Sequence, residues 1–285
     1  MPFQAHAALD KNARRLRRRA FLHSRASPVP DPHRIRQGRE KPMRCTGMKR
    51  FLSLAAALLL AAAWPGTVCA EGEPTAAFKD RLRGRILEIL DSWPAMDQYA
   101  VMFFIYPDPL CEYAGFHNMP EFTMLYKCES DIGVLDHNPY FSASGEDEER
   151  WNPAFWDFDL QQPVICYDAG NAMADALIDW YSAIGVEQVG YEDPNLMFDS
   201  RNRYIGKGPN GLAELLQLTA EIAAEIQRSG RIEAKFGRRI PILLADFEFT
   251  GYMLQATLRA NPDGEADAYI QACLRQNWVS EEQLW

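Results

Sequence analysis

Two acidic residues directly follow an apolar run near the C-terminal end of the chain. The segment R-I-P-I-L-L-A-D-F-E at 239–248 has the composition of a buried strand, and it ends in Asp246 and Glu248. Carboxyl groups held close together can act as an acid–base pair, as in the hydrolysis of glycosides. The same two side chains could instead cap a helix that begins near Gly251. Asp246 and Glu248 are therefore candidate catalytic residues with a purely structural alternative.

A second group of candidates lies in W-N-P-A-F-W-D-F-D at 151–159. Trp151 and Trp156 could stack on a sugar ring and are the candidate binding residues. Asp157 and Asp159 would lie on one side of a strand, as a pair of catalytic carboxylates must. Large aromatic side chains more often pack in a core, however. The segment predicts either a carbohydrate platform or core packing, and packing is the more economical interpretation.

Glycines at 206, 208 and 211 form the pattern G-x-G-x-x-G, which can hold a phosphate at the start of a helix. Pro209 removes one of the N–H groups that such a loop uses, and the segment before it is a doubtful strand. A turn that leads into a helix explains these glycines more simply. We therefore predict no cofactor.

Four cysteines follow residue 70, at positions 111, 128, 166 and 273. Cys111 and Cys128 flank a segment that reads as a turn and a strand, so a bridge between them is the preferred disulfide, with Cys166–Cys273 as a second. Buried thiols are the alternative. Because this part of the chain has no C-x-x-C pair and only two histidines, His117 and His137, no metal site is predicted.

Helical and extended patterns that could position these residues alternate irregularly along the chain. Helices are expected at 75–93, 171–184, 211–227, 251–260 and 264–275, and strands at 98–106, 121–128, 163–167 and 239–248. The strand at 98–106 is apolar throughout, as expected of a strand buried on both faces. Because helices and strands mix without a regular repeat, the fold class is α+β. We expect one domain over residues 71–285, with a central mixed or antiparallel sheet flanked by several helices.

Charge is distributed very unevenly along the 285 residues. Residues 1–70 contain 14 basic and 3 acidic side chains, whereas residues 71–285 contain 16 basic and 36 acidic ones, a net charge of −20. A domain this acidic is a poor candidate for nucleic-acid binding. Its long-range field would instead attract a basic protein partner.

Residues 48–70 have the pattern of a secretory signal peptide, with Lys49 and Arg50 before an apolar run and small residues before the cleavage point. We expect cleavage after Ala70, no membrane span in the cleaved chain, and a periplasmic or secreted protein. The apolar run is shorter than the roughly twenty residues that a spanning helix needs. Residues 1–47 are a basic upstream extension, interpreted as lying outside the native protein, with translation starting at Met48. The alternative is a disordered basic extension of the native chain.

Several motifs resemble the bacterial DUF4303 family. They are K-F-G-R-R-I-P-I-L-L-A-D-F-E-F-T-G at 235–251, R-A-N-P at 259–262 and E-R-W-N-P-A-F-W at 149–156. The resemblance covers most of residues 75–275 and implies a single α+β domain of unknown function. It assigns no catalytic residues, and the export signal departs from what the family leads us to expect.

Two classes of function follow from these observations. The first is an exported, non-catalytic acidic domain that binds a basic protein, much as an immunity protein neutralises a toxin. The alternative is a cell-envelope hydrolase that uses paired carboxylates beside tryptophans. A scaffolding domain of the envelope would have the same sequence features as the first class.

Overall fold

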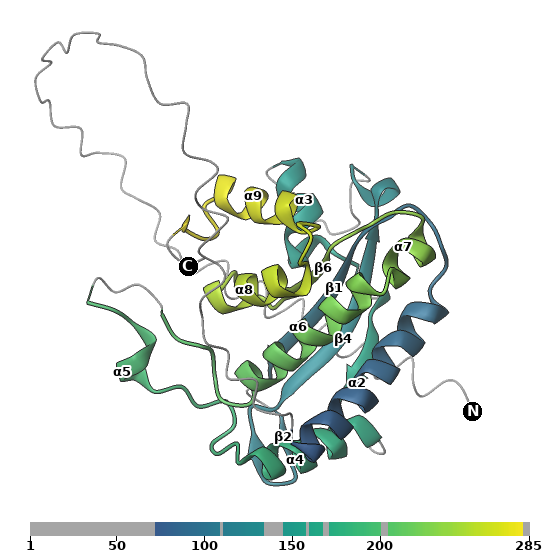
Figure 1. Cartoon of the computed structure of the whole chain (residues 1–285). Coiled ribbons are helices and arrows are strands. Elements are labelled where there is room, and N and C mark those ends of the chain that lie inside the picture. The colour runs from purple at the N-terminus through teal and green to yellow at the C-terminus, as the bar shows by residue number, and fades with distance from the viewer. Residues whose placement is uncertain are drawn as a thin grey trace, which may run out of the picture.

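The computed structural model describes residues 72–108, 111–133, 145–157, 160–167, 171–200 and 205–281 (Figure 1). The signal peptide and the upstream extension expected at 1–70 lie outside these residues. In chain order the elements are α2 (Glu73–Ser92), β1 (Gln98–Pro107), β2 (Glu112–Tyr113), β3 (Phe116–His117), β4 (Pro120–Cys128), η2 (Glu129–Asp131), α3 (Glu146–Trp151), η3 (Pro153–Phe155), β5 (Gln162–Ile165), α4 (Ala172–Ile184), α5 (Pro194–Met197), α6 (Leu212–Arg228), α7 (Arg231–Phe236), β6 (Ile242–Ala245), α8 (Gly251–Ala260) and α9 (Asp267–Arg275).

Four of the strands form one mixed sheet in the order β5-β4-β1-β6. β4 runs antiparallel to both β1 and β5, and β6 runs parallel to β1. The parallel pair is short, because only Val101–Phe104 of β1 pair with Ile242–Ala245. This arrangement confirms the predicted α+β fold with a central mixed sheet flanked by helices.

The central strand β1 divides the core into two halves. Val101, Phe103 and Ile105 face one hydrophobic cluster, which includes the inner faces of α2, α4 and α6. Met102 and Phe104 face the other cluster, which includes α9 and the tryptophans at positions 151 and 156. Since side chains alternate along a strand, an apolar run without alternation is what a strand buried on both faces requires. Figure 1 shows α2 and α6 along one side of the sheet and α3 beside α9.

At the outer edge of β6, the backbone N–H and C=O groups bond to side chains of α8 and of the residue that follows it, instead of to another strand. The Asn261 amide, just after α8, accepts the Ile242 N–H at 2.9 Å and donates to the Ile242 carbonyl at 2.8 Å. One turn earlier, the Thr257 hydroxyl contacts the Leu244 N–H and carbonyl at 2.9 and 3.0 Å. Covering an edge in this way prevents it from pairing with another chain.

Most expected elements agree with the structure to within one or two residues. The main differences are at the C-terminal end, where the strand expected at 239–248 is limited to Ile242–Ala245 and the helix expected at 264–275 begins at Asp267. The strand is shortened because Pro241 lacks an N–H and because the Asp246 side chain bonds to the backbone of the next turn. Among the described helices, none combines the length and the apolar character that crossing a membrane requires.

Candidate functional site

The buried carboxyl of Asp246 lies at the C-terminal end of the parallel strand pair. Asp246 directly follows Ala245, which pairs with Phe104. Its side chain is only 8% exposed, and its Oδ1 accepts the Glu248 N–H at 2.7 Å. Burial, with a smaller contribution from the Glu248 carboxylate, raises the pKa of Asp246 to about 7. This carboxyl can therefore hold or release a proton near neutral pH.

The surroundings of Asp246 come from the start of α8 and from the loop before α6. Burial raises the pKa of Tyr252, and the neighbouring Asp246 carboxylate adds to this effect. The loop packs closely on the same tyrosine, since a Cβ added to Gly208 would lie 3.4 Å from the Tyr252 ring. Glu248, by contrast, is exposed to solvent. The two predicted acids are thus close in space but occupy different environments.

The glycine-rich loop forms a turn, and its geometry does not favour a phosphate site. Gly208 and Gly211 have φ values of +96° and +82°, which glycine adopts without strain. The Gly211 N–H donates to the Glu214 carboxylate at 2.6 Å. Because an acidic side chain already uses an N–H at the start of α6, an anion there would be repelled.

Trp151 and Trp156 are packed in the core. They are 6% and 4% exposed, and both contact the Tyr99 ring, with centroids 5.4 and 6.4 Å apart. The Trp156 indole N–H donates to the Arg150 carbonyl at 3.0 Å. Neither ring has an open face on which a sugar could stack, so packing is the correct interpretation of this segment. Asp157 is exposed beside it, and Asp159 lies outside the described residues.

The tryptophans and the Asp246 carboxyl lie towards opposite ends of β1. The tryptophans contact Tyr99 near its start, whereas Asp246 follows Ala245, which pairs with Phe104 in the C-terminal half of β1. Tyr269 is close to both places, since its ring centroid lies 5.7 Å from that of Trp151, and burial and, to a smaller extent, the Asp246 carboxylate raise its pKa. Because both tryptophans are buried, the candidate residues from the two segments do not line one open cleft. Among the described residues, no group of three or more acidic, cysteine or histidine side chains is arranged to hold a metal ion.

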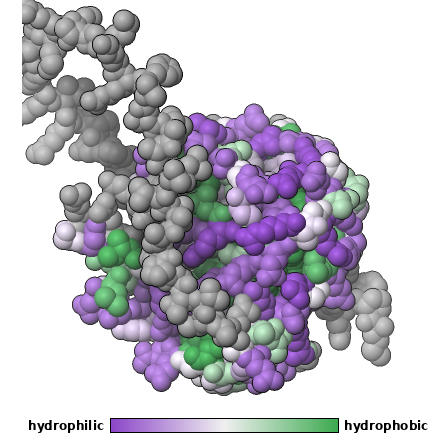
Figure 2. Space-filling view, viewed as in Figure 1, coloured by the Kyte–Doolittle hydropathy of each residue, from purple (hydrophilic) through white to green (hydrophobic). Residues whose placement is uncertain are grey.

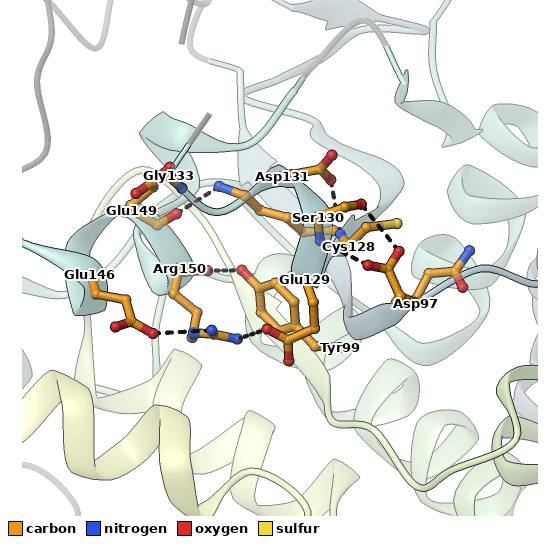
Figure 3. A network of polar contacts seen from close by, with 12 residues as sticks. Asp97, Tyr99, Cys128, Glu129, Ser130, Asp131, Gly133, Glu146, Glu149 and Arg150 are labelled. Carbon is orange, nitrogen blue, oxygen red and sulfur yellow. Dashed lines mark hydrogen bonds and ion pairs between the residues drawn. The ribbon is translucent and has the colours of Figure 1, made fainter. Parts of the chain in front are cut away.

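A polar network joins α3 to the sheet at the tryptophan end (Figure 3). Arg150 lies 4.5 Å above the Tyr99 ring centroid and forms ion pairs with Glu129 at 2.9 Å and Glu146 at 3.1 Å. The Tyr99 hydroxyl donates to the Arg150 carbonyl at 2.6 Å. These contacts fix the position of α3, and sequence analysis missed them because they join residues up to 51 positions apart.

A buried lysine on β4 also holds the segment that contains α3 and η3 against the sheet. Lys127 is 5% exposed, and its Nζ donates to the carbonyls of Glu149 and Phe155 at 2.6 and 2.8 Å. The alternation of β4, E-F-T-M-L-Y-K-C, is the one sequence feature that could have placed this lysine on an inward face. The network holds α3 and η3 against the sheet and serves a structural role.

The structure contradicts the predicted Cys111–Cys128 bridge, and none of the four described cysteines is in a disulfide. Cys128 ends β4, where it pairs with Gln98, whereas Cys111 follows the other end of β1. The eight-residue advance along β4 separates the two ends by about 26 Å, far beyond the reach of a disulfide. The turn and strand were predicted correctly, but the strand carries Cys128 away from Cys111. Burial raises the pKa of both the Cys128 and the Cys273 thiols to about 12, which keeps them protonated.

The segment R-S-G-R-I-E-A-K-F-G-R-R at 228–239 contains five basic side chains, and several of them bind acidic side chains or carbonyls of the same molecule. Arg231 forms an ion pair with Asp91, and Arg239 pairs with Asp263 at 2.7 Å. Arg238 donates to the Gln98 carbonyl at 2.7 Å. These side chains connect α7 and the start of β6 to neighbouring elements, so they do not form an open positive patch. His117 is exposed on β3, and His137 lies outside the described part of the chain.

No family model, curated protein or solved structure matches this chain. The resemblance to DUF4303 therefore stays a prediction from the sequence.

Proposed function

We propose that residues 71–285 form an exported, non-catalytic acidic domain that binds a basic protein partner. The observation that carries the proposal is that many basic side chains of this domain form ion pairs with acidic side chains of the same molecule. Internal ion pairs involve Lys79, Arg83, Arg85, Arg150, Lys207, Arg231, Arg238, Arg239 and Arg275. Since residues 71–285 contain 36 acidic against 16 basic side chains, internal pairing leaves a large negative excess.

Part of this excess lies on exposed side chains that take no part in these ion pairs. Asp179 on the outer face of α4 and Glu187 just after it are examples, and Glu281 is another near the C-terminal end. A surface with a strong excess of one sign accelerates association with an oppositely charged protein and disfavours partners of the same sign. Attraction by this field requires no catalytic residue. It is also consistent with the candidate acids Asp157 and Asp246 lying on different segments instead of forming a pair.

Affinity capture from the native host tests this proposal. The protein is expressed with a tag from its full reading frame, captured at low ionic strength, and its partners are identified by mass spectrometry. We expect a partner with more Lys and Arg than Asp and Glu. With both proteins purified, binding should weaken steeply between about 50 and 200 mM salt, since added ions screen the attraction. Sucrose at matched osmolarity should leave it unchanged.

Three results would count against the proposal: the absence of any specific partner at low salt, a partner with an acidic surface, or an affinity that does not change with salt. The negative charge would then be better explained by a role in solubility.

A cell-envelope hydrolase is the second candidate, and only Asp246 favours it. A carboxyl whose pKa lies near 7 can act as a general acid at neutral pH. If this candidate is correct, Asp246→Asn and Glu248→Gln should each abolish turnover of glycan substrates. The binding proposal expects no turnover by the unmodified protein.

A further inference from the structure

Exposed apolar side chains gather on one excursion of the chain between α4 and α6. We call residues 190–200 and 205–210 the arm. Its four exposed apolar side chains are Tyr191 at 48%, Leu196 at 68%, Phe198 at 46% and Ile205 at 61%. Elsewhere in the described residues, exposed large apolar side chains occur singly, at Met96 (53%), Leu160 (39%) and Ile184 (38%). Single exposed residues need no explanation, but a group of four on one segment does.

The arm stands away from the body of the molecule. Figure 1 shows α5 at the left, outside the layers formed by the sheet and the longer helices. Figure 2 shows apolar (green) surface at the left edge of the same view. Within α5, Asp193 caps the first turn by accepting the Asn195 N–H at 2.9 Å, and Pro194 starts the helix. This single turn carries Leu196, the most exposed of the four side chains.

Backbone hydrogen bonds hold the two sides of the arm together. At its base, the Gly190 N–H donates to the Asn210 carbonyl and the Asn210 N–H donates to the Tyr191 carbonyl, both at 2.9 Å. Farther out, the Ile205 N–H donates to the Met197 carbonyl at 2.8 Å. These bonds connect the two described segments of the arm at its base and near Met197.

The base of the arm also fits tightly against the body. Gly190 has a φ of +79°, and a Cβ added there would lie only 2.3 Å from the Asn118 Cβ. Val189, just before it, is 7% exposed and belongs to the larger core cluster. The body thus positions the base of the arm, while the outer part exposes apolar side chains.

We propose that the arm is the docking surface for the basic partner, and that it inserts Leu196 and Ile205 into an apolar pocket rimmed by Lys and Arg. Charge selects this occupant. A second copy of the chain would bring another net charge of −20 to the interface, and like charges at close range disfavour association. A cationic surface would be attracted by the same field, and among the described residues of the arm the acidic Glu192, Asp193 and Asp199 outnumber the basic Lys207.

This inference rests on the proposed binding function and adds the surface that performs it. Arg201 and Arg203 lie outside the described residues, and the proposed surface does not include them. In an interface of this kind, a few apolar anchors contribute most of the binding energy, and the surrounding charges set the orientation and the association rate.

A designed peptide tests the surface before the natural partner is identified. The probe is a fluorescently labelled, 14-residue amphipathic helix of Leu and Lys, and its counterpart replaces every Lys with Glu. Fluorescence anisotropy measures the binding of each peptide to the unmodified protein, to the Leu196→Ser/Ile205→Ser variant and to the matched Met96→Ser/Leu160→Ser variant. Circular dichroism and urea unfolding establish that all three proteins are equally folded.

The proposal predicts that the unmodified protein binds the Leu/Lys peptide and that the arm variant binds it at least about tenfold more weakly. This loss is the scale expected when two exposed anchors no longer bury apolar surface. The Met96/Leu160 variant should bind within about twofold of the unmodified protein, and the Leu/Glu peptide should not bind. The inference is overturned if the unmodified protein fails to bind the Leu/Lys peptide, if both variants bind alike, or if the Leu/Glu peptide binds as well.

The two experiments distinguish an error in the proposed surface from an error in the proposed function. If affinity capture finds a basic partner and the arm variant binds it as tightly as the unmodified protein, the binding function stands and the arm is not its surface. If affinity capture finds no basic partner, the proposed function fails whatever the peptide does.

Discussion

Asparagine at position 246 should stabilise the protein at neutral and alkaline pH. Asp246 is almost fully buried, and its Oδ1 already accepts the Glu248 N–H. An asparagine has nearly the same shape and keeps an oxygen that can accept this bond, but it cannot ionise. The substitution Asp246→Asn therefore removes the cost of a buried charge while leaving the turn before α8 intact.

The size and sign of the effect follow from the pKa. Burial raises the pKa of Asp246 from 3.8 to about 7, so the folded chain holds this proton more tightly than the unfolded chain does. Below about pH 4 the group is protonated in both states and contributes nothing. Between about pH 4 and pH 7 the unfolded chain releases this proton while the folded chain keeps it, so the free energy of unfolding falls as the pH rises, by about 4 kcal/mol in total. Above pH 7 the carboxyl is ionised in both states, and the loss no longer grows.

Urea unfolding followed by tryptophan fluorescence measures this difference at pH 4, 6 and 8. Asp246→Asn should match the unmodified protein within about 1 kcal/mol at pH 4 and exceed its stability by about 2–4 kcal/mol at pH 8. Glu248→Gln, at the exposed neighbour, should change stability by less than about 0.5 kcal/mol at either pH. A difference that is the same at all three pH values, or an Asp246→Asn variant that is less stable at pH 8, would show that the buried charge does not control this stability.

Three further substitutions test how the arm, the sheet edge and the α3 corner are held, each by its urea midpoint. Gly190→Ala should lower the free energy of unfolding by about 2–4 kcal/mol, because the new methyl group clashes with Asn118 at a backbone position that already has a positive φ. Gly115→Ala is the control, since Gly115 also has a positive φ (+85°) but open space around it, and should cost only about 1–2 kcal/mol. Equal losses for the two variants would contradict the clash. Asn261→Ala should cost about 3 kcal/mol, since it leaves the buried N–H and carbonyl at the edge of β6 without partners, and a loss under about 1 kcal/mol would show that the edge needs no cover. Lys127→Met should cost about 2–3 kcal/mol, because the partly buried carbonyls of Glu149 and Phe155 lose their donor. Lys235→Met, at a more exposed lysine, should cost under about 1 kcal/mol, and a neutral Lys127→Met would mean that these carbonyls find other donors.

The elements of this fold could be predicted because their patterns are local. The apolar run at 98–106 predicted a strand buried on both faces, and β1 has this environment. The periodic segment at 211–227 predicted α6 to within one residue at each end. What could not be predicted is the pairing of β1 with β6, since their partners lie about 140 residues apart and no local pattern encodes that contact.

The candidate site was harder to predict because its properties depend on what surrounds each residue. The sequence identified Asp246 and Glu248 as neighbours at the end of a strand, but it could not show that one is buried and the other exposed. It placed Cys111 and Cys128 around a turn and strand without showing that the strand separates them. The apolar side chains of the arm resemble ordinary core residues in the sequence, and only the fold shows that Leu196 is 68% exposed.

Binding of a basic partner through the arm is tested most directly by a photo-crosslinking amino acid placed at Leu196 in the native host, with the same residue at Met96 as the matched control. Both positions are exposed and apolar, but only the first lies on the arm. We expect a covalent adduct between position 196 and a protein whose basic residues outnumber its acidic ones, and no such adduct from position 96. Identical adducts from both positions, a crosslink only to a second copy of the chain, or no adduct at position 196 would contradict binding through the arm.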